Sequence, residues 1–193
     1  PAGWQGRRIL LHFDAVDYDA TVWVNGQKLG EHQGGYDRFT FDITDALKAG
    51  TDQEVVVAVF DPTNDGQQAH GKQTLHPAGA SYTATSGIWQ TVWLEPVAAD
   101  GIEDFKIVPD VDDSLLRLTV RGRNAGLGSR IEAVALLDGR TIAKATGVVG
   151  SEIDLHIKNA QLWSPEKPFL YDLKIKLTRA GKAVDEVGSY FGM

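Results

Sequence analysis

Residues 10–44 have the sequence LLHFDAVDYDATVWVNGQKLGEHQGGYDRFTFDIT, and this stretch predicts strands joined by tight turns. Apolar residues alternate with other side chains from Ile9 to Val16 and again from Phe39 to Ile43, which is the period-two pattern of a strand. Between them, an apolar run leads into Asn25-Gly26, which favours a type I′ hairpin turn because both central residues of that turn need a positive φ. A second corner carries Gly34-Gly35-Tyr36. We expect three strands in one antiparallel sheet, whose apolar face a second layer must cover.

Short strands continue along the rest of the chain. Glu54–Phe60 is apolar at nearly every position, as expected for a central strand covered on both faces, and Gly87–Glu95 shows the alternation of another strand. Pro96–Gly101, with the sequence PVAADG, is the best candidate for a domain boundary. Beyond it follow about seven short strands with turn signals such as Asp138-Gly139, which is the pattern of an immunoglobulin-like sandwich. No long amphipathic helix is evident, so the predicted class is all-β.

Composition narrows the range of functions. The 193 residues suit one or two domains, and 42% hydrophobic with 23% charged residues is ordinary for a globular protein. The formal net charge of −7 argues against binding to nucleic acid or to an anionic membrane surface. No apolar run approaches the roughly 18 residues of a membrane span. Cysteine is absent, which excludes disulfides and thiolate chemistry but does not locate the protein.

The opening stretch resembles the N-terminal, sugar-binding-type jelly-roll of the glycoside hydrolase family 2 enzymes, which include β-galactosidases, β-glucuronidases and β-mannosidases. Two later segments fit the same family in the same order, namely SGIWQTVWL at Ser86–Leu94 and NAQLWSPE at Asn159–Glu166. The three motifs together span most of the chain. The resemblance implies a galactose-binding-like jelly-roll sandwich over residues 1–97, incomplete at its start, and an immunoglobulin-like β-sandwich over residues 98–193.

The same resemblance makes us expect a piece of a larger protein. The chain starts at Pro1 without an initiator Met or a signal peptide, at a point that lies inside the first sandwich of the family. Its last residues, Gly188–Met193, look like the final strand before the catalytic barrel of the family. Strands missing from the first sandwich would leave an unpaired sheet edge, which invites self-association.

The sequence offers no constellation of catalytic residues. Retaining glycosidases need two carboxylates about 5–5.5 Å apart, and in the resembled family both are glutamates on the barrel, outside this chain. Ser86-Gly87 forms no G-x-S-x-G nucleophile elbow, and no glycine pattern matches a phosphate-binding loop. We interpret Asp14, Asp17 and Asp19 as surface and turn aspartates. The chain by itself is therefore predicted to have no catalytic residues.

Metal and cofactor sites are not predicted either. Asp110, Asp112 and Asp113 lack the glycine and the glutamate that an EF-hand loop requires, so a solvated turn is the better interpretation. His70 and His76 share one loop without a third ligand at a spacing typical of zinc. We expect no bound metal and no cofactor.

Sugar contact remains as the function that the residues favour. The segment Asp61–Ser86 is a polar loop between two predicted strands, and loops of this length are usually functional or disordered. In the resembled enzymes the loops at this end of the jelly-roll reach the rim of the active site. By that resemblance a set of polar residues lines the substrate entrance, namely Asp61, Asn64, Lys72, Gln73 and Tyr82. The alternative is that these residues hold the loop together or dock it on the barrel.

Tryptophans are the other candidates for sugar contact. Trp23, Trp89, Trp93 and Trp163 could each present a flat surface to a sugar ring. Aromatic residues of strands are more often part of a core or of an interface between domains, and we assign these four to packing.

Three hypotheses follow for the function. The chain is the non-catalytic N-terminal portion of a retaining β-glycoside hydrolase, in which it braces the missing barrel and helps to shape the carbohydrate pocket. Alternatively it is a stand-alone carbohydrate-binding module, or a structural pair of sandwiches without a ligand. A β-sandwich fold alone does not separate these roles.

Overall fold

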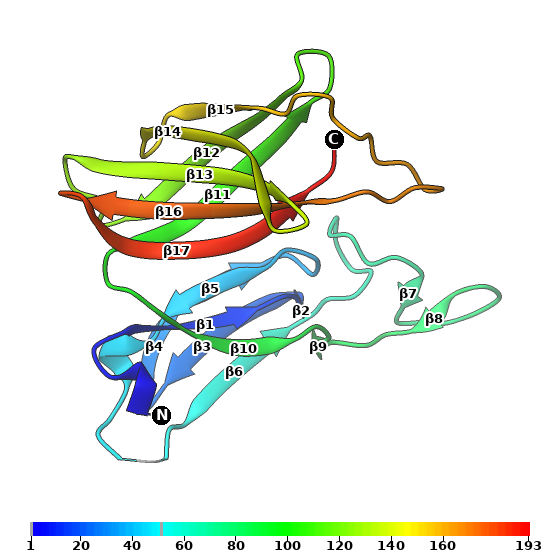
Figure 1. Cartoon of the computed structure of the whole chain (residues 1–193). Coiled ribbons are helices and arrows are strands. Elements are labelled where there is room, and N and C mark those ends of the chain that lie inside the picture. The colour runs from blue at the N-terminus through cyan, green and yellow to red at the C-terminus, as the bar shows by residue number, and fades with distance from the viewer. Residues whose placement is uncertain (1, 51) are drawn as a thin grey trace. The chain divides into compact units, whose positions relative to one another are not determined.

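The computed structural model describes residues 2–50 and 52–193 and is nearly all strand (Figure 1). Strands hold 56% of the residues and helix only 3%, which confirms the predicted all-β class. The chain divides into two compact units, Pro1–Val97 and Ala98–Met193. In the part of the chain that the structure describes, no helix is long and apolar enough to cross a bilayer.

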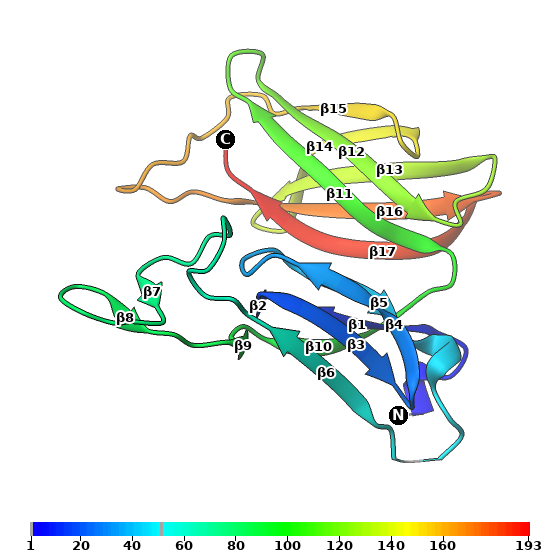
Figure 2. The same cartoon turned by 180° about the vertical axis from the view of Figure 1, so that it is seen from behind.

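The first unit is a sandwich of two three-stranded sheets with the orders β10-β1-β5 and β4-β3-β6 (Figure 2). Its elements, in chain order, are η1 (Ala2–Trp4), β1 (Arg8–Phe13), β2 (Val16–Asp17), β3 (Asp19–Val24), β4 (Gln27–Gln33), β5 (Phe39–Asp42), η2 (Thr44–Ala46), β6 (Val55–Phe60), β7 (Gln73–Thr74), β8 (Tyr82–Thr83), β9 (Gly87–Ile88) and β10 (Val92–Val97). Side chains from both sheets meet in one core, with Phe13 of β1 and Val22 of β3 almost fully buried.

The expectation of three strands in one sheet was wrong, because residues 10–44 supply strands to both sheets. β1 pairs with β5 and β10 in one sheet, whereas β3 and β4 belong to the other. The alternation of apolar residues shows which side chains face the core, but it does not show which strands are neighbours. The predicted turn is confirmed, because Asn25 and Gly26 have φ of 52° and 82° and connect β3 to β4.

β6 was expected to be a central strand and is instead an edge strand. Among the described residues it pairs only with β3, and Val56 and Phe60 are 45% and 67% exposed. A continuous apolar run indicates burial on both faces only if other elements cover both faces. The strand predicted at Gly87–Glu95 is interrupted, since β9 ends at Ile88 and β10 begins at Val92.

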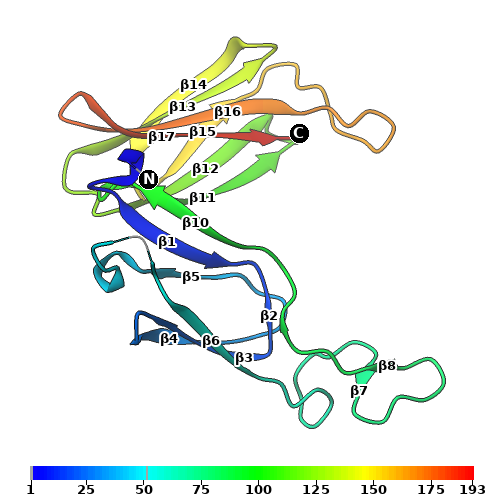
Figure 3. The same ribbon diagram turned by 90° about the horizontal axis from the view of Figure 1, so that it is seen from below.

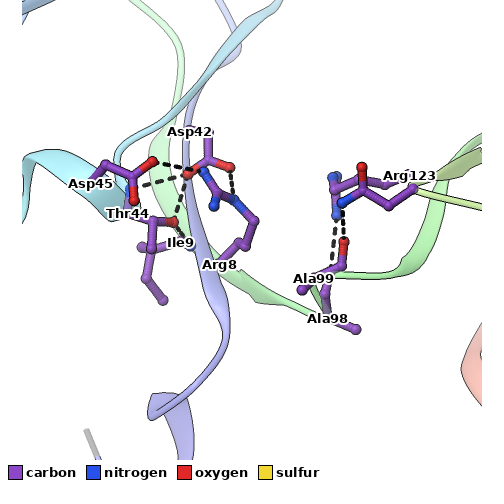
Figure 4. A network of polar contacts seen from close by, with 9 residues as sticks. Arg8, Ile9, Asp42, Thr44, Asp45, Ala98, Ala99 and Arg123 are labelled. Carbon is purple, nitrogen blue, oxygen red and sulfur yellow. Dashed lines mark hydrogen bonds and ion pairs between the residues drawn. The ribbon is translucent and has the colours of Figure 1, made fainter.

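A polar network fastens one end of the first sandwich. Arg8 of β1 forms an ion pair with Asp42 at the end of β5 and a second with Asp45 (Figure 4). Asp42 also accepts hydrogen bonds from the backbone N–H and the hydroxyl of Thr44, at 3.0 Å and 2.6 Å. The hydroxyl oxygen of Thr44 in turn accepts from the Ile9 N–H at 2.8 Å. The network therefore joins β1, β5 and the turn η2.

The second unit is a sandwich with the sheet orders β11-β12-β15 and β14-β13-β16-β17. Its strands are β11 (Gly101–Asp110), β12 (Leu115–Arg123), β13 (Ser129–Leu137), β14 (Arg140–Val148), β15 (Glu152–His156), β16 (Tyr171–Arg179) and β17 (Lys182–Phe191). These seven strands confirm the predicted immunoglobulin-like pattern. Asp138 and Gly139 have φ of 50° and 75°, as the predicted type I′ turn requires.

The ends of the second sandwich are fixed by hydrogen bonds within the unit. The Asp185 carboxylate accepts a hydrogen bond from the Ile102 N–H at 2.8 Å. The Arg123 guanidinium donates to the Ala98 carbonyl (Figure 4). The backbone N–H of Trp163 donates to the Met193 carbonyl at 2.6 Å, although the side chain of Trp163 is 49% exposed. Trp163 therefore fastens the last residues without filling the core.

Candidate functional site

The loop Asp61–Ser86 extends away from the two sheets of the first unit and has structure of its own (Figure 3). It contains β7 and β8, which pair in parallel with Gln73 opposite Tyr82 and Thr74 opposite Thr83. The Tyr82 N–H also donates to the Lys72 carbonyl at 2.8 Å. The loop is thus a folded arm, and its residues have defined positions.

Three of the five predicted site residues hold this arm together. The Asp61 carboxylate accepts from the Thr63 N–H at 2.6 Å and from the Ser86 hydroxyl at 2.7 Å, so it joins the two ends of the loop. Asn64 accepts from the Leu75 N–H at 2.9 Å. Gln73 accepts through Oε1 from both the N–H and the hydroxyl of Thr85, at 2.6 Å and 2.9 Å. Each of the three residues accepts hydrogen bonds from the loop through its side-chain oxygens. The side-chain NH₂ groups of Asn64 and Gln73 are not used in these bonds.

The other two predicted residues present their side chains to solvent. Tyr82 is 64% exposed and Lys72 is also exposed. Within residues 2–50 and 52–193, neither side chain takes part in a hydrogen bond or an ion pair. Both side chains are therefore available to another molecule or to another part of a longer protein.

A pocket at the base of the arm has a volume of about 350 Å³. It includes Gln73 but none of the other four predicted residues. Its lining comes from the β2 end, the 34–36 corner, the arm and the segment that follows it, namely Asp17, Tyr36, Gln73, Thr85, Ser86, Gly87, Ile88 and Trp89. Three parts of the chain, around Asp17, around Tyr36 and from Gln73 to Trp89, therefore build one concavity.

Asp17 is the charged residue of this pocket, and the interpretation of it as a plain surface aspartate missed its position. The short ladder of β2 and β9 places Asp17 opposite Gly87. Partial burial raises the pKa of the Asp17 carboxyl above its usual value, and the negative charge of nearby Asp61 raises it further. In the described part of the chain, the Asp17 carboxylate accepts no hydrogen bond, so its oxygens are available to a ligand.

Trp89 and Tyr36 form the aromatic wall of the pocket. The Trp89 indole N–H donates to the Gly35 carbonyl at 2.7 Å, and its ring meets Tyr36 edge-on with centroids 5.8 Å apart. The two side chains are 52% and 58% exposed, so Trp89 is not part of the core of the first unit. Trp89 lies in the SGIWQTVWL motif, but the motif does not show that the strand breaks there and turns the ring outward.

Metal ligands are not gathered in the described residues, where no group of three His, Cys, Asp or Glu side chains could hold an ion. Asp110 and Asp113, discussed above as a possible calcium turn, instead pair with Arg117 at 2.8 Å and 2.9 Å. The Arg117 guanidinium lowers the pKa of the Asp110 carboxyl.

Family models match both units of the chain. The model described as "Glycosyl hydrolases family 2, sugar binding domain" matches residues 1–96, and the model described as "Glycosyl hydrolases family 2" matches residues 101–193.

Curated relatives match nearly the whole chain. A β-galactosidase from Thermoanaerobacter pseudethanolicus is 28% identical over 94% of the chain and 25% of its own length. A β-glucuronidase from Bacteroides fragilis is 28% identical over 98% of the chain and 29% of its own length. The crystal structure of Ruminococcus gnavus β-glucuronidase superposes with a TM-score of 0.79 at 23% identity, over 100% of this chain and 34% of that one, which shows the shared fold. The chain spans less than a third of the length of the curated relatives named here.

Proposed function

The chain belongs to family 2 of the glycosyl hydrolases, as its three motifs predicted, and we propose that it forms the non-catalytic N-terminal portion of a retaining β-glycoside hydrolase. The two sandwiches brace a catalytic barrel, and the arm Asp61–Ser86 helps to shape the entrance for a carbohydrate substrate. The observation that supports this proposal most is the match of almost the whole chain to a minor part of enzymes named β-galactosidase and β-glucuronidase.

The predicted site residues have two roles in this proposal. Asp61, Asn64 and Gln73 fix the conformation of the arm through the hydrogen bonds described above. Lys72 and Tyr82 make the contact with the substrate or with the rim of the barrel, because their side chains are exposed on a folded arm. Loops that a rigid scaffold positions in this way commonly carry function.

The partners that we propose are a β-linked carbohydrate and the barrel of the same protein. The net charge of −7 disfavours nucleic acid and anionic membranes. A second copy of the chain is a further partner, through the edge of β6. This strand has the sequence VVVAVF, without the charges or prolines that usually protect an edge.

A side-by-side assay tests the proposal. The chain and the full-length protein that contains it are incubated with a panel of aryl β-glycosides, and release of nitrophenol is measured. We expect hydrolysis by the full-length protein and none by the chain. Hydrolysis by the chain itself would refute the non-catalytic role, and inactivity of both would favour the stand-alone binding module.

Matched substitutions in the full-length protein test the contact residues. Tyr82→Ala is compared with Tyr190→Ala, since the two tyrosines are 64% and 65% exposed, and Lys72→Ala is compared with Lys158→Ala. We expect the Tyr82 and Lys72 variants to raise KM, because a contact at the entrance contributes to substrate binding, while the variants in the second unit do not. If the two variants of each pair have the same KM, Tyr82 and Lys72 do not contact the substrate.

A further inference from the structure

The pocket at the base of the arm has the size and the wall of a site for one sugar ring. Its volume of about 350 Å³ lies at the lower end of the roughly 300–1,000 Å³ that small-molecule sites occupy. Such sites combine an apolar wall with a few placed polar groups. Trp89 and Tyr36 supply a wall of large, rigid aromatic surface, and the hydrogen bond of Trp89 to the Gly35 carbonyl fixes its ring.

The polar groups of the pocket include an acceptor and a donor that the protein leaves unused. The Asp17 carboxylate makes no hydrogen bond with the described residues. Gln73 accepts from Thr85 through Oε1, which fixes the amide and leaves its NH₂ group as a donor. A carboxylate and an amide NH₂ together complement adjacent sugar hydroxyls, each of which can donate one hydrogen bond and accept others.

Charge decides which sugars the pocket accepts. Asp17 is the charged side chain among the described residues that line it, and Asp61 adds a second carboxylate nearby. A carboxylate on the ligand would meet like charge at short range, which is unfavourable in a partly desolvated site. We propose that this pocket binds one neutral hexopyranose ring, with Asp17 and Gln73 hydrogen-bonded to its hydroxyls and Trp89 against its C–H face.

The pocket needs little rearrangement to bind such a ring. β2 and β9 hold Asp17 opposite Gly87, next to Trp89 in sequence. Gly35 lets the carboxylate approach the corner, because a Cβ on this residue would lie only 2.7 Å from Asp17 Oδ1. A preformed site avoids part of the entropy cost of binding. This inference goes beyond the proposed function, because the binding requires no catalytic barrel.

A titration of the 193-residue chain with simple glycosides tests the inference. Methyl β-galactoside and methyl β-glucoside are the neutral probes, methyl β-glucuronide is the anionic one, and the five indole N–H signals are followed by ¹H–¹⁵N NMR. The Trp89→Phe variant identifies the signal of Trp89. We expect a neutral glycoside to shift that signal saturably and the glucuronide to leave it unchanged. A flat response to both neutral probes, or an equal response to the glucuronide, would overturn the inference.

Two matched variants separate a bound sugar from a nonspecific effect. Asp17→Asn should weaken binding about tenfold, because hydrogen bonds to a charged acceptor are stronger than those to a neutral one. Asp19→Asn is the control, since Asp19 lies two residues away and bonds to Gln33 outside the pocket. Gly35→Ala should also weaken binding by displacing the Asp17 carboxylate. If Asp17→Asn and Asp19→Asn bind equally while both spectra remain folded, the site is not at Asp17. Hydrolysis by the full-length protein is measured separately, so failure here leaves the proposed function intact.

Discussion

The two sandwiches of this chain have the same architecture but differ in how much apolar surface they cover. The second unit buries a core that includes Leu116, Leu118 and Ile175 at 0% exposure, within strands of up to ten residues. The first unit has strands of at most seven residues and leaves Phe60 67% and Leu94 45% exposed. The second unit therefore has the larger buried core, and we expect substitutions in that core to cost more stability than comparable substitutions in the first unit.

The largest effect should come from removing a core leucine of the second unit. Leu118→Ala should destabilise that unit by about 3 kcal/mol, because it leaves a cavity in a core that cannot fully collapse. Leu94→Ala in the first unit removes the same atoms from a side chain that is 45% exposed and should cost far less. Hydrogen exchange resolved by unit measures both. Similar costs for the two variants would contradict the contrast between the units.

Substitution of Gly30 by alanine tests how closely the two sheets of the first unit approach each other. A Cβ on Gly30 of β4 would lie 2.6 Å from the ring of Phe41 on β5, in the opposite sheet. Gly30→Ala should therefore destabilise the first unit by about 1–3 kcal/mol through overpacking.

Gly188 of β17 is the matched control for this substitution. No atom lies within 4 Å of a Cβ built on Gly188, so Gly188→Ala should be neutral or should stabilise the second unit by about 0.5 kcal/mol. Urea unfolding measures both variants. An unchanged midpoint for Gly30→Ala would mean that the ring of Phe41 moves aside freely.

The sequence predicted the elements of the fold better than their arrangement. Alternation and the two type I′ turns are local signals, so Asn25-Gly26 and Asp138-Gly139 were placed correctly. The assignment of β1 and β3 to different sheets depends on contacts between distant residues, for which a single sequence carries no signal. For the same reason the apolar run of β6 did not show that this strand lies at an edge.

The candidate site was likewise only partly predictable, because contacts between distant residues form it. The polar composition of Asp61–Ser86 indicated a functional loop, and Gln73 of the predicted set does line the pocket. Asp17, Tyr36 and Trp89 were not in that set, because each lies in a segment whose local pattern is that of a strand or a turn. Only the folded chain brings these three segments together, and the pocket could not be assembled from sequence.

A charge on the exposed edge should reduce self-association without changing the fold. Ala58 is exposed on β6, and Ala58→Lys places a cation there, which is how natural edge strands avoid pairing. We expect the mean mass in sedimentation equilibrium to shift toward the monomer. Ala180→Lys is the control, because Ala180 is exposed in the turn between β16 and β17 of the second unit. An equal shift for both variants, or a wild-type chain that is monomeric at every concentration, would exclude β6 as the contact.

The smallest expected change in stability concerns two carboxylates of the first unit, Asp42 and Asp17, whose pKa values shift in opposite directions. Burial raises the pKa of Asp42, but the hydrogen bonds from Arg8 and Thr44 together outweigh it and lower the pKa overall. For Asp17, burial and the charge of Asp61 both raise the pKa. The ionised form of Asp42 therefore stabilises the fold at neutral pH, and this contribution is lost as the pH falls below the unfolded value of about 3.9. The ionised form of Asp17 costs stability at neutral pH, and that cost disappears as the pH falls from its raised folded pKa to the unfolded value of about 3.9.

Substitution by asparagine should consequently have opposite signs at the two positions. At pH 7 Asp42→Asn should lower the urea midpoint of the first unit and Asp17→Asn should raise it, each by a small amount because both groups remain partly exposed to solvent. Both differences from wild type should shrink in acid, since the wild-type carboxyls are then neutral as well. Tryptophan fluorescence reports the transition, because four of the five tryptophans lie in the first unit. A loss of stability in Asp17→Asn at pH 7 would mean that this carboxylate has a partner within the fold, and it would then not be free to hold a sugar hydroxyl.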